Sequence, residues 1–358
     1  MNIVDRNQAA KEYVATLLNA AGTAQVSDFP LFSSETEIHK ILTLLIETNA
    51  KGFRGLVVTA LAGLHLDAAY DPLNNFYGCS PRAIFEQGIW YALQDGGVPC
   101  GKSDPLNVAK NVSVLDENWA KGKRPESSAM AVVKFLRKFM AADQAQKALL
   151  EKYFFYRLKT YALSITTYNI TTVDSGLVSR QDVGSKLVAF TLAYPESGVL
   201  PQFLVAQLLV ASFQESTVKV VGGEESVFGT NTTSKKPADI WLEHQGSETN
   251  LYEITVKPVT HKRLDDSISA LSSTGHLNHS VTFICRFPDD IKELNVINGS
   301  YSYKEKVFDF VDYKNFCLSL LALITNEQFN ILLADMSTLV KDKQISLKTK
   351  TGWNDFFG

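Results

Sequence analysis

The stretch KKPADIWLEHQGSETNLYEITVKPVTHKR, residues 235–263, carries most of the structural and functional information in this chain. Residues 239–243 are typical of a strand, and a second strand-like run starts at Leu251 and extends through Lys257. The polar residues 244–250 between them predict a turn. We therefore expect the two runs to pair as a β-hairpin.

Acidic and basic side chains gather along this predicted hairpin. Side chains alternate faces along a strand, so Glu253, Thr255 and Lys257 are expected to point to one side. Pairing of the two strands brings Asp239 beside Glu253. Two carboxylates and an ammonium at a sheet edge suit Mg²⁺ and a water that attacks a phosphodiester. Asp239 and Glu253 are therefore the predicted metal ligands.

This arrangement resembles the nucleases of the PD-(D/E)XK superfamily, to which many type II restriction endonucleases belong. The superfamily's motif is Asp, a spacer, then Asp or Glu, one residue, and Lys, within the order helix, three strands, helix, strand. The resemblance covers roughly residues 200–290 by the predicted elements. In this sequence the corresponding segments are the apolar helix 201–215, the short strand 217–221, the two strands of the hairpin, the helix 264–272 and the buried strand 280–287.

The sequence departs from the superfamily motif at the lysine, because the residue two positions after the second acid is Thr255. Lys257 lies one pleat, about 7 Å, further along the same face. Either Lys257 acts from there, or Thr255 positions the water while Lys257 neutralises the phosphate; Lys219 on the preceding strand is a third candidate. The resemblance also implies Glu215 as a further metal-binding acid and the carbonyl of Ile254 as a further ligand.

Length and composition predict a folded globular protein, and the resemblance implies the α/β class. The chain has 358 residues, of which 45% are apolar and 20% are charged, as in ordinary globular proteins. Residues 1–198 are mainly helical in pattern and are expected to bind and recognise DNA. Residues 199–358 are expected to form the nuclease core, a mixed central sheet flanked by helices, with C-terminal helical and strand additions.

Charge and cysteine usage narrow the class of protein further. The net charge of −3 gives no global basic field, but DNA binding requires only local positive charge. Four cysteines without a C-x-x-C pair and six histidines without ligand spacing indicate a reducing compartment and argue against zinc. No apolar run reaches the length of a membrane helix, and the N-terminus is not typical of a signal peptide. We expect a cytoplasmic protein with no membrane partner.

A basic segment in the helical region is a candidate DNA contact. Residues 121–138 hold six basic side chains and one acidic one, a net of +5. Lys134, Arg137 and Lys138 share a helix face, which suits contact with phosphates or the major groove. A solvated helix face is the structural alternative.

The segment that leads into Asp239 is a second candidate DNA contact. Residues 222–234 are rich in Gly, Thr, Asn and Ser, and hydroxyls and amides suit phosphate contact. Asn231, Thr233, Lys235 and Lys236 are the residues expected to bind DNA there. A flexible surface loop is the alternative.

The sequence GGVPCGKS at residues 96–103 matches the expression for a phosphate-binding P-loop. That loop requires a strand before it and a helix starting at the lysine. The preceding residues have helical periodicity, and Pro105 follows soon after Ser103. We therefore predict a glycine-rich turn, with Lys102 able to touch backbone phosphate, rather than a nucleotide site.

These patterns together predict a Mg²⁺-dependent, sequence-specific endonuclease for double-stranded DNA. The runs GCSPRAIFEQGIWYAL, CGKSDPLNVAKN and GTNTTSKKPADIWLE look similar to the SacI-type restriction endonucleases, which implies the palindromic site GAGCTC and a homodimer. A two-fold enzyme also suits a palindrome, because two identical sites then cut both strands. The alternatives are a non-catalytic DNA-binding protein with a decayed nuclease core, since the expected lysine is displaced, and a P-loop NTPase.

Overall fold

The computed structural model describes residues 2–173, 179–222 and 236–358, and the chain forms two compact units. The helical unit comprises Met1–Tyr168 and Asp342–Leu347, and the sheet unit comprises Asn169–Lys341 and Lys348–Gly358. The predicted boundary after residue 198 falls inside the sheet unit. The reason is that α10 (Arg180–Ala193) packs against α11 (Val199–Phe213) and α13 (Tyr313–Leu323).

The helical unit is built around α3 (Gly52–Leu66). Every residue of α3 from Gly52 to Gly63 is buried, as expected for a helix that is apolar on all sides. The buried Arg54 guanidinium donates hydrogen bonds of 2.5–2.9 Å to the carbonyls of Ile46, Thr48 and Pro99. These bonds offset the cost of burying its charge.

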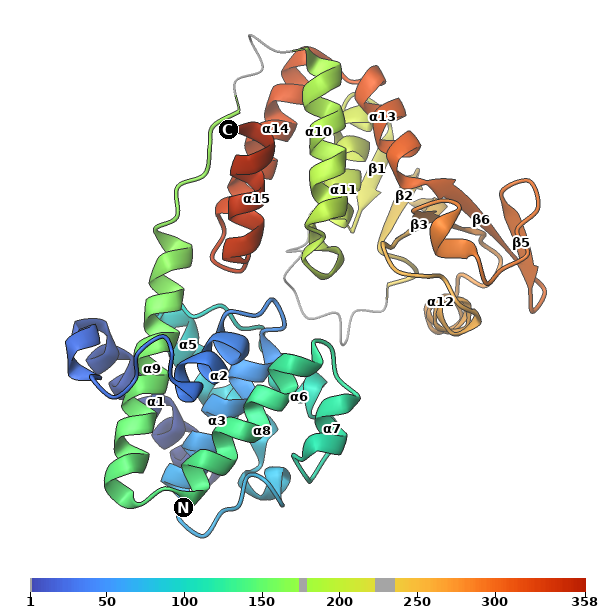
Figure 1. Ribbon diagram of the computed structural model, residues 1–358. Helices are drawn as coiled ribbons and strands as arrows, with labels where there is room; N and C mark the ends of the chain where they lie inside the picture. The colour runs from blue at the N-terminus through green and yellow to red at the C-terminus, as the bar shows by residue number, and fades with distance from the viewer. Residues whose placement is uncertain (1, 174–178, 223–235) are drawn as a thin grey trace. The chain divides into compact units, whose positions relative to one another are not determined.

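Helices surround α3 in this unit (Figure 1). Contacts run from α3 to α1, α2, α6 and α8. The described secondary structure of the unit is helical throughout. Its other helices are α1 (Ile3–Thr23), α2 (Glu37–Ile46), α4 (Pro81–Ile84), α5 (Trp90–Asp95), α6 (Asp104–Val108), α7 (Glu117–Lys121), α8 (Glu126–Ala141) and α9 (Gln144–Thr166), with short 3₁₀ turns at Val26–Asp28 and Phe76–Cys79 and a π-helical turn at Phe85–Ile89.

The sheet unit contains a six-stranded mixed sheet in the order β1-β2-β3-β4-β6-β5. β1, β2 and β3 pair antiparallel, β3, β4 and β6 pair parallel, and β5 is antiparallel to β6. The predicted α/β class with a mixed sheet is confirmed at this level. The strands are β1 (Val218–Val221), β2 (Ile240–His244), β3 (Ser247–Ile254), β4 (Val281–Cys285), β5 (Ser300–Tyr303) and β6 (Lys306–Asp312), and the helices not yet named are α12 (His261–Thr274), α14 (Asn326–Lys341) and α15 (Leu347–Phe357).

Helices cover the two faces of the sheet unequally (Figure 1). On β3, the ring of Tyr252 packs on Phe316 of α13, with 6.0 Å between ring centroids. The neighbouring Leu251 lies in a core with Leu264 and Leu271 of α12. Thus α13 and its neighbours α10 and α11 cover one face and α12 covers the other. Because strand side chains alternate, Glu253 is on the α12 side.

The turn of the β2–β3 hairpin is shorter than predicted. Gln245 and Gly246 alone form it, both with positive φ (52° and 78°), which is the backbone geometry of a tight two-residue hairpin turn. Residues 247–250, predicted as turn, therefore belong to β3. The extra strand length follows from the backbone geometry of the turn rather than from side-chain polarity.

The second predicted strand also ends earlier than expected. β3 stops at Ile254, and the Thr255 hydroxyl accepts a hydrogen bond of 3.1 Å from the Lys257 amide. Such a side-chain turn competes with continuation of a strand. The prediction that Glu253, Thr255 and Lys257 share one strand face is therefore wrong.

The helix before β1 is the most apolar in the unit. The stretch Glu196–Phe213, which includes α11, is long and apolar enough to cross a membrane by length and composition alone, whereas the sequence analysis expected no such run. In the fold, α11 packs against α10, α13, α14 and β1. It therefore serves as a core helix of the sheet unit.

We predict that Gly222→Ala destabilises the protein more than Gly275→Ala. Both glycines have positive φ (91° and 81°), but an added Cβ at Gly222 would lie 2.4 Å from the Asp239 carbonyl oxygen, whereas at Gly275 it meets nothing within 4 Å. The left-handed backbone alone costs about 1–2 kcal/mol in either variant. Urea unfolding of both variants measures the difference. Equal losses would show that the close approach of Gly222 to Asp239 has no energetic consequence.

Candidate active site

The β2–β3 hairpin places two acids side by side. Ile240 and Tyr252 are paired directly, Asp239 precedes the first and Glu253 follows the second. Asp239 Oδ2 accepts a hydrogen bond of 3.0 Å from the Ile254 amide, which fixes the carboxylate across the hairpin. Glu253 is 8% exposed. The structure thus brings together the two residues that the motif singles out.

Arg263, in the first turn of α12, completes this acid pair. Its Nη2 donates a hydrogen bond of 2.6 Å to Glu253 Oε2 and lies 4.0 Å from Asp239 Oδ2. The sequence analysis did not single out Arg263. The signal was present, because α12 begins with His-Lys-Arg and has no acid in its first turn, although cations are disfavoured at a helix N-terminus.

The electrostatics of the pair favour an added cation. Burial and, second, the charge of Asp239 raise the pKa of Glu253 to about 8, although Arg263 opposes both effects. Burial also raises the pKa of Asp239, against the Ile254 amide and the charges of Arg263 and Lys236. Although Arg263 and Lys236 act on the pair, the pKa values of both acids stay above their ordinary values. A divalent cation would add positive charge beside the two carboxylates.

The available donor atoms fit Mg²⁺. Mg²⁺ prefers oxygen ligands and is usually held by one or two carboxylates together with several waters. Asp239 and Glu253 offer two carboxylates, and the carbonyl of Ile254 stays a predicted further oxygen. Among residues 2–173, 179–222 and 236–358, no group of three or more His, Cys, Asp or Glu side chains is placed to hold a metal.

The predicted sources of the ammonium are not hydrogen-bonded or ion-paired to the acids within the described residues. Lys257 is exposed in the turn after β3, and the Thr255 hydroxyl is engaged with the Lys257 backbone at 3.1 and 3.3 Å. Lys219 pairs with Glu243 on β2, four residues from Asp239 and therefore roughly 13 Å along the strand.

Glu215 lies at the opposite end of the hairpin from the acids. α11 ends at Phe213, so Glu215 is in an exposed turn before β1. Val218, three residues later, pairs with His244, which is five residues or roughly 17 Å along β2 from Asp239. The structure does not bring Glu215 to the acid pair, because the helix ends two residues earlier than predicted.

The basic face of α8 is partly neutralised within the helical unit. The Arg137 guanidinium makes a two-pronged ion pair with Glu117, and Lys138 Nζ lies 2.8 Å from Glu37. Lys134 is exposed on the same helix, and its charge helps to lower the pKa of Glu37. The solvated-face alternative thus accounts for Arg137 and Lys138.

The second set of predicted DNA contacts lies mostly outside the described residues. This applies to Asn231, Thr233 and Lys235. Lys236 is described, and its positive charge lowers the pKa of Asp239. Lys236 is therefore placed near the acids.

The GGVPCGKS segment is a packed turn. The helix α5, not a strand, precedes it, and the Gly101 amide donates a hydrogen bond of 2.6 Å to Asp104 Oδ2. Cys100 is fully buried, and Lys102 Nζ lies 5.2 Å from the ring centroids of both Trp90 and Tyr91. The amide that a phosphate would need is already used, as expected for a glycine-rich turn.

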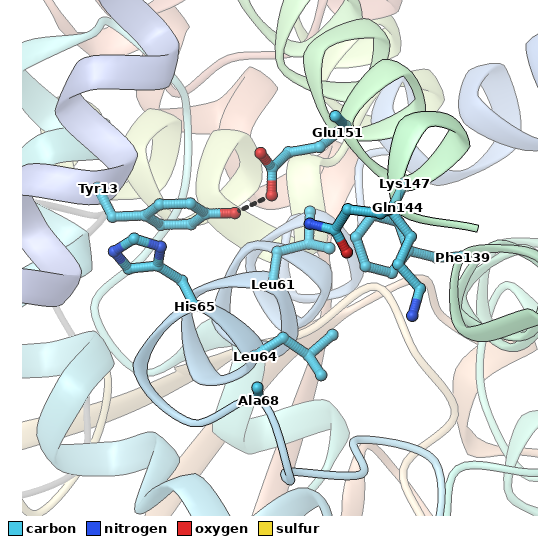
Figure 2. A pocket seen from close by; sticks show the side chains of 10 residues that line it. Tyr13, Leu61, Leu64, His65, Ala68, Phe139, Gln144, Lys147 and Glu151 are labelled. Carbon is cyan, nitrogen blue, oxygen red and sulfur yellow. Dashed lines mark hydrogen bonds between the residues drawn. The ribbon is translucent and has the colours of Figure 1, made fainter. Parts of the chain in front are cut away.

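A pocket of about 410 Å³ in the helical unit is a separate feature (Figure 2). The Tyr13 hydroxyl donates to Glu151, and the Tyr13 ring stacks on His65 with 4.3 Å between ring centroids. Figure 2 shows these three side chains turned toward one another. None of the predicted site residues lines this pocket.

Neither protein-family models nor curated proteins match this chain. The assignment of the site therefore rests on its own geometry. That geometry is the acid pair at the end of the β2–β3 hairpin, with the Ile254 amide and the Arg263 guanidinium as its partners.

We predict that Glu253 makes the protein less stable as pH rises. Its pKa in the folded protein, about 8, exceeds the ordinary value of 4.5, so between these values the folded state binds more protons than the unfolded state. The stability it contributes is present below about pH 4.5 and is lost as pH rises toward 8. In the absence of added metal, the stability of the Glu253→Gln variant should not show this part of the decline with rising pH. Urea unfolding at several pH values tests it, and parallel curves for the two proteins would contradict it.

Proposed function

We propose that this chain is a Mg²⁺-dependent nuclease of the PD-(D/E)XK superfamily that cuts double-stranded DNA, and specifically a type II restriction endonuclease. The observation that carries the proposal is the pair formed by Asp239 and the buried Glu253, side by side at the end of an antiparallel hairpin. The element order α11, β1, β2, β3, α12, β4 supports it, because it agrees with the order of the superfamily core.

In this proposal Asp239 and Glu253 bind the metal, and contacts within the fold fix the positions of these two side chains. Mg²⁺ when bound would activate a water and neutralise charge on the phosphate. Asp239 and Glu253 would hold it through carboxylate oxygens, with the Ile254 carbonyl as a further oxygen. The Ile254 amide orients Asp239, and burial of Glu253 keeps bulk water away from its carboxylate. Burial also strengthens each electrostatic contact at the site.

The helical unit would bind DNA and contribute to recognition of the sequence. The similarity to SacI-type enzymes supports a palindromic site, GAGCTC, and a homodimer that presents two copies of the acid pair. A restriction enzyme would act in the cytoplasm. The proposed phosphate contacts are Lys102, Lys134, Arg137, Lys138 and the segment that ends at Lys236.

A second candidate is a DNA-binding protein with an inactive nuclease core. The displaced lysine favours it, because Lys257 is exposed in the turn after β3 and does not take part in the ion pairs of the acids. A P-loop NTPase is disfavoured by the helix that precedes residues 96–103.

Incubation of the full chain with phage DNA and Mg²⁺ separates these candidates. Discrete fragments that disappear when EDTA is added support restriction. Tight binding without cutting supports the inactive core. ATP hydrolysis without DNA cleavage would support the NTPase.

We predict that Asp239→Asn and Glu253→Gln each lower the cleavage rate by about 100-fold or more, since each removes a carboxylate needed for the metal. Specific DNA binding should persist, because these acids do not read bases. Asp289→Asn is the matched control, because Asp289 is a 72% exposed acid paired with Lys292. Cleavage by either site variant at a tenth or more of the wild-type rate removes that residue from the metal site.

We also predict that Lys134 and Arg137 of α8 contribute unequally to DNA binding. Lys134→Gln should weaken binding to all DNA sequences alike and lower the slope of log affinity against log salt by about one. Arg137→Gln should have a smaller effect, because Glu117 already neutralises Arg137. Fluorescence anisotropy over a range of KCl concentrations measures both slopes. Unchanged slopes in both variants would identify α8 as an ordinary solvated face.

A further inference from the structure

A cation that contacts the acid pair comes from α12 and not from the strand that carries Glu253. Arg263 lies within 4.0 Å of an oxygen of each acid. We propose that Arg263 supplies the positive charge that contacts the scissile phosphate, in place of the lysine that the superfamily motif puts two residues after the second acid. This inference rests on the proposed nuclease function and names a residue that the motif does not contain.

The chemistry of the guanidinium suits this task. Arginine stays charged at all relevant pH values and carries five N–H donors in a plane. Within the described part of the chain, the hydrogen bond from Nη2 to Glu253 is the one that this guanidinium makes. Its side chain is 42% exposed, so it borders solvent beside the buried acids. The remaining donors are free to bind phosphate oxygens in the two-pronged manner typical of arginine.

The surroundings of α12 hold Arg263 at this position. Leu264, the next residue, is fully buried in the core between α12 and the sheet. The segment between β3 and α12 is fixed by Arg286, whose Nη2 donates to the Val256 carbonyl at 2.6 Å and pairs with Asp290 at 2.7 Å. The Val259 amide in turn donates to the Asp290 carbonyl at 2.6 Å. The first turn of α12 is therefore fixed by the buried Leu264 and by the hydrogen-bonded segment that precedes the helix.

The lysines considered from sequence do not share this geometry. Lys257 is exposed in the turn after β3, and Lys219 pairs with Glu243, toward the turn end of the hairpin. Lys236 acts on Asp239 through its charge, but it precedes the acid on the segment that enters β2. Arg263 is the residue that contacts Glu253 directly and borders Asp239 as well.

A purely structural role must be separated from phosphate contact, because Arg263 also neutralises the acids. The first experiment therefore starts from the full chain with Asp239→Asn and Glu253→Gln, in which no charged acid needs a partner. Binding of a short DNA duplex is measured in EDTA by fluorescence anisotropy at increasing KCl. Adding Arg263→Gln should lower the salt slope by about one, whereas adding Arg263→Lys should keep it. An unchanged slope for Arg263→Gln overturns the proposal, because an arginine that only balances the acids has no effect in this background.

The second experiment measures single-turnover cleavage with saturating Mg²⁺ in the protein that retains both acids. Arg263→Gln should lower the rate by about 100-fold or more, as loss of a transition-state donor does, and Arg263→Lys should recover about tenfold of that loss. The matched controls Lys257→Gln and Lys262→Gln remove the same charge nearby and should stay within about threefold of wild type. Thermal unfolding confirms that each variant is folded.

The outcomes distinguish this inference from the proposed function. If Asp239→Asn and Glu253→Gln are inactive while Arg263→Gln cuts at the wild-type rate, the nuclease stands and the role of Arg263 is overturned. The same holds if Lys257→Gln is inactive and Arg263→Gln is not. If the wild-type chain cuts no DNA with Mg²⁺, the nuclease function fails, and the salt slope still decides whether Arg263 contacts phosphate.

Discussion

The register of the β2–β3 hairpin is the constraint on which the site depends. The two-residue turn at Gln245 and Gly246 starts the pairing, with His244 opposite Ser247. The irregularity between Leu242 and Glu243 then shifts the register by one residue, and this shift places Asp239 beside Glu253. Without the shift, Asp239 would lie opposite Tyr252, and Glu253 would be displaced from it. Backbone geometry thus determines where the carboxylates lie.

Burial of Glu253 then raises the free-energy cost of keeping its carboxylate charged. The core between α12 and the sheet, with Leu251 and Phe283 among its members, removes water from the side of the hairpin that carries Glu253. A protein that only needed stability would fill this position with an apolar side chain, because an unmatched buried charge is costly. The fold instead has two acids there, Asp239 and Glu253, and Arg263 of the neighbouring helix α12 pairs with them. Such a costly arrangement is common where chemistry is done.

Much of this unit could be predicted from the sequence, and the exceptions have physical causes. Short apolar runs indicated β2 and β4, and the two acids were identified because they follow the Asp–spacer–acid motif on paired strands. The register shift between Leu242 and Glu243 could not be predicted. The ends of elements were less predictable: the hydroxyl of Thr255 ends β3 early, and α11 stops before Glu215. Arg263 was missed because its partner lies ten residues away across a helix–sheet contact, and local patterns carry no such information. The counter-charges of Lys138 and Arg137 on α8 could not be predicted, since Glu37 and Glu117 come from other helices.

The division of the chain into two units has a consequence for its synthesis. The helical unit is not complete at residue 168, because it includes Asp342–Leu347. Within that segment Lys343 Nζ donates to the Gln94 carbonyl at 3.3 Å, and Gln344 accepts from Lys51 at 3.1 Å. Domains usually fold in order as they leave the ribosome. Here the helical unit acquires residues 342–347 only after residues 169–341 of the sheet unit have been translated, so its assembly cannot be completed before then.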